Sequence, residues 1–195
     1  MLKPFELASE AKPDLRQIKW QETEFYALIS YGLPVFTGKQ YGDGFTPPAV
    51  FWPEDMDTDS WCETAKNAGM KGIVYNCKDY DGFCLWQTAM TDYGIKNSKW
   101  RDGEGDMVRL LADSCKKFGL KFGISIAPWD RHESTYGSGK AYDDWFCGLL
   151  TELLTNYGDI FYVRLDGHCG LSHGRMQDVD WGRYYSLIRK LMPDA

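Results

Sequence analysis

The sequence predicts an α/β fold of four strand-helix units with parallel strands, the arrangement of half a (β/α)8 barrel. Two features of the 195 residues carry this prediction. Four apolar β-type runs alternate with amphipathic helical stripes, which demands parallel strands joined by crossover helices. The connections after the strands are long and aromatic, whereas the returns from helix to strand are short, as in barrels. Because a complete barrel takes roughly 250 residues, this chain is too short to close one alone.

The four strands are expected where apolar and β-branched residues form short runs bounded by turn residues. They are Glu24–Gly32, Gly72–Lys78, Lys121–Pro128 and Ile160–Gly167.

Each strand is followed by a helical pattern. The clearest runs from Met107 to Phe118, with apolar or small residues on one face, Asp106 as N-cap and Gly119 just beyond the end. Three similar helical patterns contain Trp61, Trp145 and Trp181, and they end at Gly69, at Gly158 and before Pro193, respectively.

We therefore divide the chain into an N-terminal arm, residues 1–19, and a half-barrel, residues 20–195. A flavodoxin-like open sheet shares the alternation and is the alternative, although no Gly-rich first turn of dinucleotide type is present.

Composition excludes several classes of function. The net charge of −6 is spread along the chain and Lys and Arg never cluster, so we expect no nucleic-acid partner. No run of 18 apolar residues occurs, so we expect a soluble protein without a membrane partner. The six cysteines form no CxxC pair. His168 and His173 with Asp166 or Asp79 are conceivable metal ligands, but no HxxxH or HExxH spacing supports them, so we predict neither a metal nor another cofactor.

Six stretches carry a resemblance to a known family. They are AGMKG (68–72), DGFCLW (81–86), KNSKWRDGEGD (96–106), GLKFG (119–123), PWDR (128–131) and LTNYGDIFYVRLDG (154–167). In order and spacing they resemble the α-L-fucosidases of glycoside hydrolase family 29, over almost the whole chain from about Trp20 onward. The resemblance implies the N-terminal half of that family's catalytic barrel.

The resemblance also implies a reaction. Relatives of this kind are retaining enzymes in which an Asp at the end of the fourth strand attacks the anomeric carbon, and Asp166 stands at that position. Retaining hydrolysis uses two carboxyl groups about 5–5.5 Å apart, and the resemblance places the acid/base carboxylate C-terminal to Ala195. Without the resemblance, an Asp-Gly pair ending an apolar strand still predicts a carboxylate at the mouth of the sheet, with a loop-capping Asp as the alternative.

Departures from the family gather at its sugar-binding positions. Relatives carry His where Ser30 stands and a Glu-Trp pair where Gln40 and Tyr41 stand. They carry a His-His pair at positions 79 and 80, usually Tyr at 125, and Trp at 164. The residues expected to line the altered pocket are Ser30, Gln40, Tyr41, Asp79, Tyr80, Trp86, Ser125, Trp129, Arg164 and His168, with Asn76 and Gln87 of similar polar character.

These replacements predict a changed site. Each lost buried partner costs roughly 1–3 kcal/mol, so six or seven losses predict negligible hydrolysis of α-L-fucosides. Arg164 and Asp166 are two residues apart on a strand and share a face, so they can pair, which would lower the pKa of the carboxyl group. We expect the Asp166 carboxylate to lie within ion-pair distance of Arg164, or within hydrogen-bond distance of Tyr80 or His168.

Two other interpretations remain open: an engineered or redesigned barrel with a new small-molecule binding or catalytic site, and a purely structural self-assembling half-barrel. A half-barrel leaves two open sheet edges and an apolar inner face. We therefore expect a homodimer or a complementary half-barrel as partner, and a sugar or other small molecule as ligand. The start of the chain, Met-Leu-Lys-Pro-Phe-Glu, has no signal-peptide core, whereas relatives are commonly secreted, periplasmic or lysosomal, so no compartment is predicted.

Overall fold

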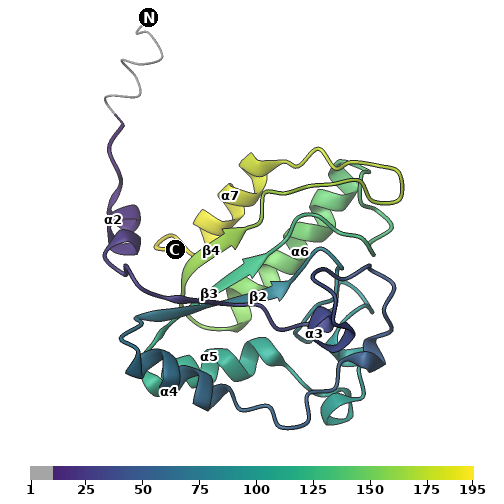
Figure 1. Ribbon diagram of the computed structural model, residues 1–195. Coiled ribbons are helices and arrows are strands. Elements are labelled where there is room, and N and C mark those ends of the chain that lie inside the picture. Colours follow the sequence, from purple (N-terminus) through teal and green to yellow (C-terminus); the bar gives the residue numbers. More distant parts are fainter. Residues whose placement is uncertain (1–10) are drawn as a thin grey trace, which may run out of the picture.

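A computed structural model describes residues 11–195, which contain one parallel sheet with the strand order β1-β2-β3-β4 (Figure 1). The strands are β1 (Ala27–Ile29), β2 (Gly72–Lys78), β3 (Lys121–Ile126) and β4 (Ile160–Leu165). A flavodoxin-like sheet has the order 2-1-3-4-5 instead. The sequential order therefore confirms the four strand-helix units of a half-barrel.

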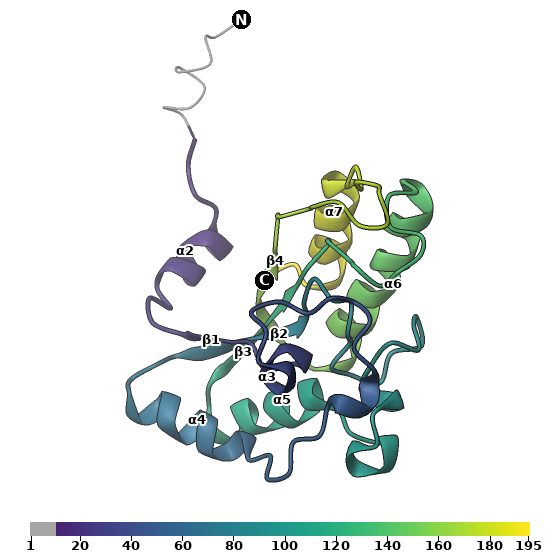
Figure 2. The same ribbon diagram turned by 45° about the vertical axis from the view of Figure 1, so that its right-hand side comes forward.

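Four longer helices follow the strands in turn and succeed one another around the sheet (Figures 1 and 2). They are α4 (Thr58–Asn67), α5 (Met107–Phe118), α6 (Lys140–Asn156) and α7 (Trp181–Leu191). The loops also hold a short helix, α3 (Leu33–Thr37), and the 3-10 turns Pro48–Val50, Ile95–Asn97 and Trp100–Gly103. Among residues 11–195, no helix is both long enough and apolar enough to cross a bilayer.

Helix α5 shows how the sequence sets both ends of an element. The Asp106 side chain accepts a hydrogen bond from the backbone N–H of Arg109, and Gly119 closes the helix in the left-handed region at φ 69°. On its apolar face, Met107 and Leu111 are fully buried. Burying one such side chain contributes about 1.5–3 kcal/mol. The boundaries predicted for this helix are confirmed.

The first strand is shorter than predicted. It spans Ala27–Ile29 rather than Glu24–Gly32. It is an edge strand with one neighbour, β2, and Glu24 adopts a positive φ of 53° in a turn before it. Gly32 then becomes the N-cap of α3. An apolar run without pairing partners at its ends therefore overstates the length of the strand.

The predicted boundary between arm and half-barrel falls inside a helix. Residues 1–10 of the arm lie outside the described residues, and helix α2 (Leu15–Gln21) continues across position 19. A capping box between Asp14 and Gln17 starts this helix. Near its end, the Trp20 ring stacks on Tyr162 of β4, with ring centroids 5.7 Å apart. The helix thus touches the sheet through Trp20, although none of its residues is buried.

A buried ion pair ties together the loops at the carboxyl ends of the strands. Lys78 is the last residue of β2, and its Nζ lies 2.9 Å from Oδ2 of Asp130. Both side chains are at most 1% exposed. Lys78 also donates to the carbonyl of Ala127 at 2.8 Å, and Asp130 Oδ1 accepts from the backbone N–H of His132 at 2.8 Å. The end of β2 is thereby fixed to the loop after β3, on the rim that carries the site.

Candidate active site

Asp166 directly follows β4, at the carboxyl end of the sheet. Its backbone N–H donates to the carbonyl of Ile126, the last residue of β3, at 3.3 Å. Its side chain is 24% exposed, so a ligand can reach the carboxylate. The predicted position at the mouth of the fourth strand is confirmed.

Three donors hold the Asp166 carboxylate. The Tyr80 hydroxyl donates to Oδ2 at 2.6 Å and Arg164 Nη2 donates to the same oxygen at 3.4 Å. The backbone N–H of His168 reaches Oδ1 at 3.3 Å. Burial by itself raises the pKa of Asp166, but the hydrogen bonds from Tyr80 and His168 and the charge of Arg164 outweigh it, so the pKa is lowered. The carboxylate is therefore ionised at neutral pH.

Arg164 is positioned by the neighbouring strand. Ser125 of β3 is paired in register with Arg164, and its Oγ accepts a hydrogen bond from Arg164 Nη1 at 3.1 Å. Ser125 is fully buried, so it acts on the site through the guanidinium rather than by touching a ligand. The predicted pairing of Arg164 with Asp166 is confirmed.

Aromatic rings surround the Tyr80 side chain. Trp129, Tyr41 and His168 have ring centroids 4.9, 5.6 and 6.0 Å from that of Tyr80. Trp129 is 8% exposed and packs against Tyr80 from the buried side, whereas Tyr41 is 48% exposed. Burial, and then the hydrogen bond to Asp166, raise the pKa of Tyr80. The phenol therefore stays protonated and remains a donor to the carboxylate.

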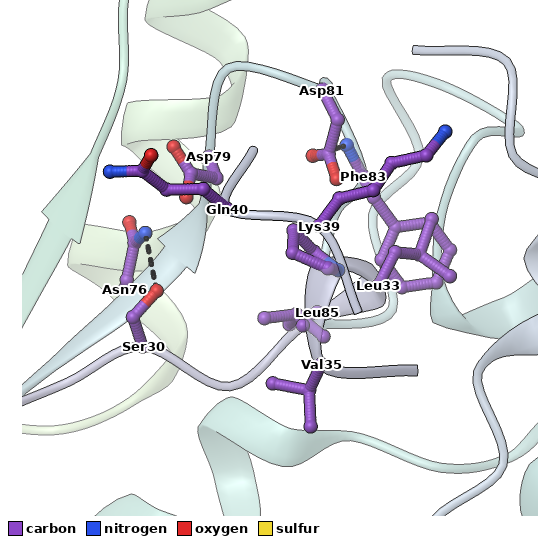
Figure 3. A pocket seen from close by; sticks show the side chains of 12 residues that line it. Ser30, Leu33, Val35, Lys39, Gln40, Asn76, Asp79, Asp81, Phe83 and Leu85 are labelled. Carbon is purple, nitrogen blue, oxygen red and sulfur yellow. Dashed lines mark hydrogen bonds between the residues drawn. The ribbon is translucent and has the colours of Figure 1, made fainter. Parts of the chain in front are cut away.

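Three other predicted residues lie together in an adjoining cavity. Ser30, Gln40 and Asp79 line it, and Asn76 donates to Ser30 Oγ at 3.3 Å (Figure 3). Gln40 also donates to the Tyr41 hydroxyl at 3.2 Å, which connects the cavity wall to the aromatic group beside Asp166. The structure therefore divides the predicted residues between the surroundings of Asp166 and this cavity.

Trp86 and Gln87 are not ligand contacts. Trp86 is 1% exposed, and its indole N–H donates to Glu152 of α6 at 2.9 Å, so the ring belongs to the core. Gln87 uses its amide to hold the carbonyls of Gly103 and Gly105 at 2.8 and 2.7 Å. The burial of Trp86 differs from the expected place in the pocket wall, because the long loop after β2 folds back and covers the ring, whereas Gln87 stays exposed and braces that loop.

The histidines show no metal-binding arrangement. His132 donates through Nδ1 to the carbonyl of Gly44, 2.7 Å away, and its ring stacks on Tyr93 with the centroids 3.8 Å apart. His173 lies edge-on to Phe45. In the part of the chain that the structure describes, no three His, Cys, Asp or Glu side chains are placed to hold an ion.

Two charged residues that the sequence did not single out, Lys39 and Asp81, also line the cavity. Asp81 is only 2% exposed. Burial is the main cause that raises the pKa of its carboxyl group, to about 6. Its position two residues after Asp79, in the turn that follows β2, is the signal in the sequence that points to this cavity.

The sequential sheet, the helices around it and a site at the carboxyl ends of the strands define the class of protein, a portion of a (β/α)8 barrel. The family model of α-L-fucosidase matches residues 10–193. The chain therefore belongs to the α-L-fucosidase family, glycoside hydrolase family 29, and the resemblance carried by the motifs is confirmed.

Relatives show how much of the family's length the chain represents. It is 36% identical to α-L-fucosidase 1 of Arabidopsis thaliana, over all of this chain and 38% of the plant protein. It is 38% identical to a putative α-L-fucosidase 1 of Oryza sativa subsp. japonica, over 92% of this chain and 34% of that protein. The chain thus spans little more than a third of these curated relatives.

Solved structures agree with the fold. A putative α-L-fucosidase from Bacteroides ovatus superposes with a TM-score of 0.91 and 41% identity, over 94% of this chain and 32% of that one. A glycoside hydrolase 29 family member from an unknown rumen bacterium superposes with a TM-score of 0.88 and 41% identity, over 94% and 35% of the two chains. The four-stranded sheet matches the N-terminal part of these larger proteins.

Proposed function

We propose that this chain carries the nucleophile, Asp166, of a retaining glycoside hydrolase. The observation that supports this most is an ionised, reachable carboxylate at the end of the fourth strand, held by Tyr80 and Arg164. Both donors bind Oδ2, whereas Oδ1 has a single 3.3 Å contact to a backbone N–H. Oδ1 is therefore the oxygen more available for attack.

The chemistry follows from that arrangement. Oδ1 attacks the anomeric carbon, the bond to the leaving oxygen breaks, and a glycosyl ester of Asp166 forms. The leaving oxygen takes a proton from an acid, and water then hydrolyses the ester, with the same acid acting as base. The Tyr80 hydroxyl keeps the carboxylate oriented and ionised between these steps.

We propose further that hydrolysis of α-L-fucosides is negligible. Ser30, Gln40 and Asp79 stand where relatives carry the imidazole and carboxylate groups that hold fucose. Each missing partner costs roughly 1–3 kcal/mol of affinity. A chromogenic α-L-fucoside tests this directly. Turnover within about tenfold of the typical enzyme value, on the order of 10 per second, would contradict it.

The role of Asp166 is tested with a panel of aryl glycosides that carry good leaving groups, which reduces the need for an acid. We expect Asp166→Asn to abolish whatever hydrolysis the panel reveals while barely changing the melting temperature. A variant that unfolds but keeps its activity per folded molecule would make Asp166 a structural cap instead.

The association expected from the sequence stays a proposal. Leu28 of β1 is 53% exposed, and Phe161 and Val163 of β4 are only partly buried, so both edge strands carry accessible apolar side chains. We propose that a second copy or a complementary half-barrel covers them. Light scattering at micromolar concentration decides this, because a monomer with a single cooperative melt would contradict it.

A further inference from the structure

Two buried thiols face each other between helices α4 and α5, which lie side by side on one face of the sheet (Figures 1 and 2). Cys62 belongs to α4 and Cys115 to α5, and their Sγ atoms are 3.8 Å apart. Both side chains are 0% exposed. The fold therefore holds two sulfur atoms in contact inside the core, although their residues are 53 positions apart in the sequence.

The other four cysteines have different surroundings. Cys77 and Cys84 are also fully buried, but each thiol donates to the backbone carbonyl two residues before it, at 3.4 and 3.7 Å. Cys147 and Cys169 are partly exposed. Within residues 11–195, no other two thiols are hydrogen-bonded to each other. Burial alone therefore does not account for the contact between Cys62 and Cys115.

Polar contacts fix the two helices beside the thiols. The hydroxyl groups of Thr58 in α4 and Ser114 in α5 are 2.8 Å apart, and Ser114 Oγ donates to Asp59 Oδ1 at 2.6 Å. Lys117 pairs with the other oxygen of Asp59. These residues lie within one turn of the thiols on either helix, so the packing of α4 on α5 presents the two sulfur atoms to each other.

We propose that Cys62 and Cys115 form a reversible disulfide when the chain meets a small disulfide oxidant such as oxidised glutathione. The thiolate of one cysteine attacks a sulfur atom of the oxidant and releases one glutathione. The second cysteine then attacks the mixed disulfide and releases the other. The two protein thiols lose two electrons and two protons in total, and the oxidant carries these away as two glutathione thiols.

The surroundings favour Cys62 as the attacking group. The hydrogen bond with Cys115 lowers the pKa of the Cys62 thiol, although burial opposes this. The thiolate is the reactive form of cysteine. Because both side chains are fully buried, the oxidant reaches them when α4 and α5 separate locally, or before the two helices pack during folding.

Closing the bond needs little movement and has a clear consequence. A disulfide is about 2.05 Å long, so the sulfur atoms approach by less than about 2 Å, a displacement on the scale of side-chain rotation. The bond joins α4 to α5 and closes a loop that contains β2 and Tyr80, the donor to Asp166. Such a crosslink restricts the unfolded chain and thereby stabilises the fold.

The test oxidises the chain and maps the linkage. The chain is treated with oxidised glutathione while folded and also during refolding from urea. Free thiols are then blocked with iodoacetamide in denaturant, and the unreduced digest is read by mass spectrometry. We expect the peptide with Cys62 to be joined to the peptide with Cys115, and Cys77 and Cys84 to carry the blocking group. The melting temperature should rise by roughly 5–10 °C, and dithiothreitol should reverse the rise.

Variants locate the effect. Cys62→Ala and Cys115→Ala each remove one partner, and we expect both to lose the rise in melting temperature on oxidation. Cys77→Ala is the matched control, because it removes an equally buried thiol that has no thiol partner, and it should keep both the linkage and the rise. If the two cavity-forming variants fail to fold, the linkage map of the native chain decides the matter.

Both thiols blocked after refolding with the oxidant, a stable mixed disulfide with glutathione, or a linkage of either thiol to a third cysteine would overturn the proposal. A correct linkage that leaves the melting temperature unchanged would overturn its stabilising role. Asp166→Asn is expected to form the same bond as the native chain, so the result is independent of the reaction proposed for Asp166.

Discussion

Two carboxylate-cation pairs lie at the same rim of the sheet and differ in almost every physical respect. The Lys78–Asp130 pair is 2.9 Å apart with side chains at most 1% exposed, whereas Arg164–Asp166 is 3.4 Å apart with side chains 39% and 24% exposed. The first also binds backbone groups of the loop after β3. The second leaves one carboxylate oxygen with a single weak contact. Accessibility, rather than charge pairing, separates the candidate site from the scaffold that supports it.

The largest effect is expected from breaking the buried pair. Lys78→Met leaves the Asp130 carboxylate buried without its cation, which should lower the free energy of unfolding by about 3–5 kcal/mol. Urea unfolding measures this. The control is Lys140→Met, which removes an exposed i,i+4 pair with Asp144 and should leave stability nearly unchanged. Similar losses in the two variants would refute the distinction between the pairs.

A smaller, pH-dependent effect is expected at Asp81. Burial raises the pKa of its carboxyl group in the folded state to about 6, above the ordinary value, so the folded state holds the proton more tightly. Its contribution to stability is therefore greatest below pH 4 and is lost as the pH rises through 6, by about 2–3 kcal/mol. In Asp81→Asn, the free energy of unfolding should not show this decrease between pH 4 and pH 7. A native chain whose pH dependence matches that of the variant would contradict it.

The smallest effect is expected from Tyr80→Phe, which removes one donor to Asp166 and keeps the ring. We expect a loss of roughly two- to tenfold in the rate of any reaction at Asp166. The pKa of Asp166 lies below its ordinary value in the folded chain. The ionised carboxylate therefore stabilises the fold at pH values above the ordinary pKa, and this stabilisation is lost as the pH falls through the lowered pKa. In Tyr80→Phe the acidic limb of the rate profile should move to higher pH.

Tyr41→Phe is the matched control for that substitution, since the Tyr41 hydroxyl accepts from Gln40 and has no hydrogen bond to Asp166. An acidic limb that moves equally in both variants would show that Tyr80 acts through packing rather than through its hydroxyl group.

The sequence predicted what depends on local pattern. Asp106 and Gly119 set the ends of α5 by their own chemistry, and the two-residue spacing of Arg164 and Asp166 placed them on one face. What failed depends on tertiary contacts. Strand β1 is short because it pairs with only one neighbouring strand, and Trp86 is buried by the loop after β2. The Asp81 oxygen that lacks a hydrogen-bond donor packs against Gly42, which comes from another loop. No spacing along the chain encodes such contacts.

The proposal for Asp166 is tested most directly by trapping the covalent intermediate. A panel of 2-deoxy-2-fluoro glycosyl fluorides is suited to this, because fluoride leaves without a proton and the fluorine at C2 slows breakdown of the ester. Mass spectrometry of the digested protein should show a glycosyl adduct on the peptide that contains Asp166, absent in Asp166→Asn and retained in Asp81→Asn. An adduct on another residue, or none from any member of the panel, would contradict the assignment of Asp166 as nucleophile.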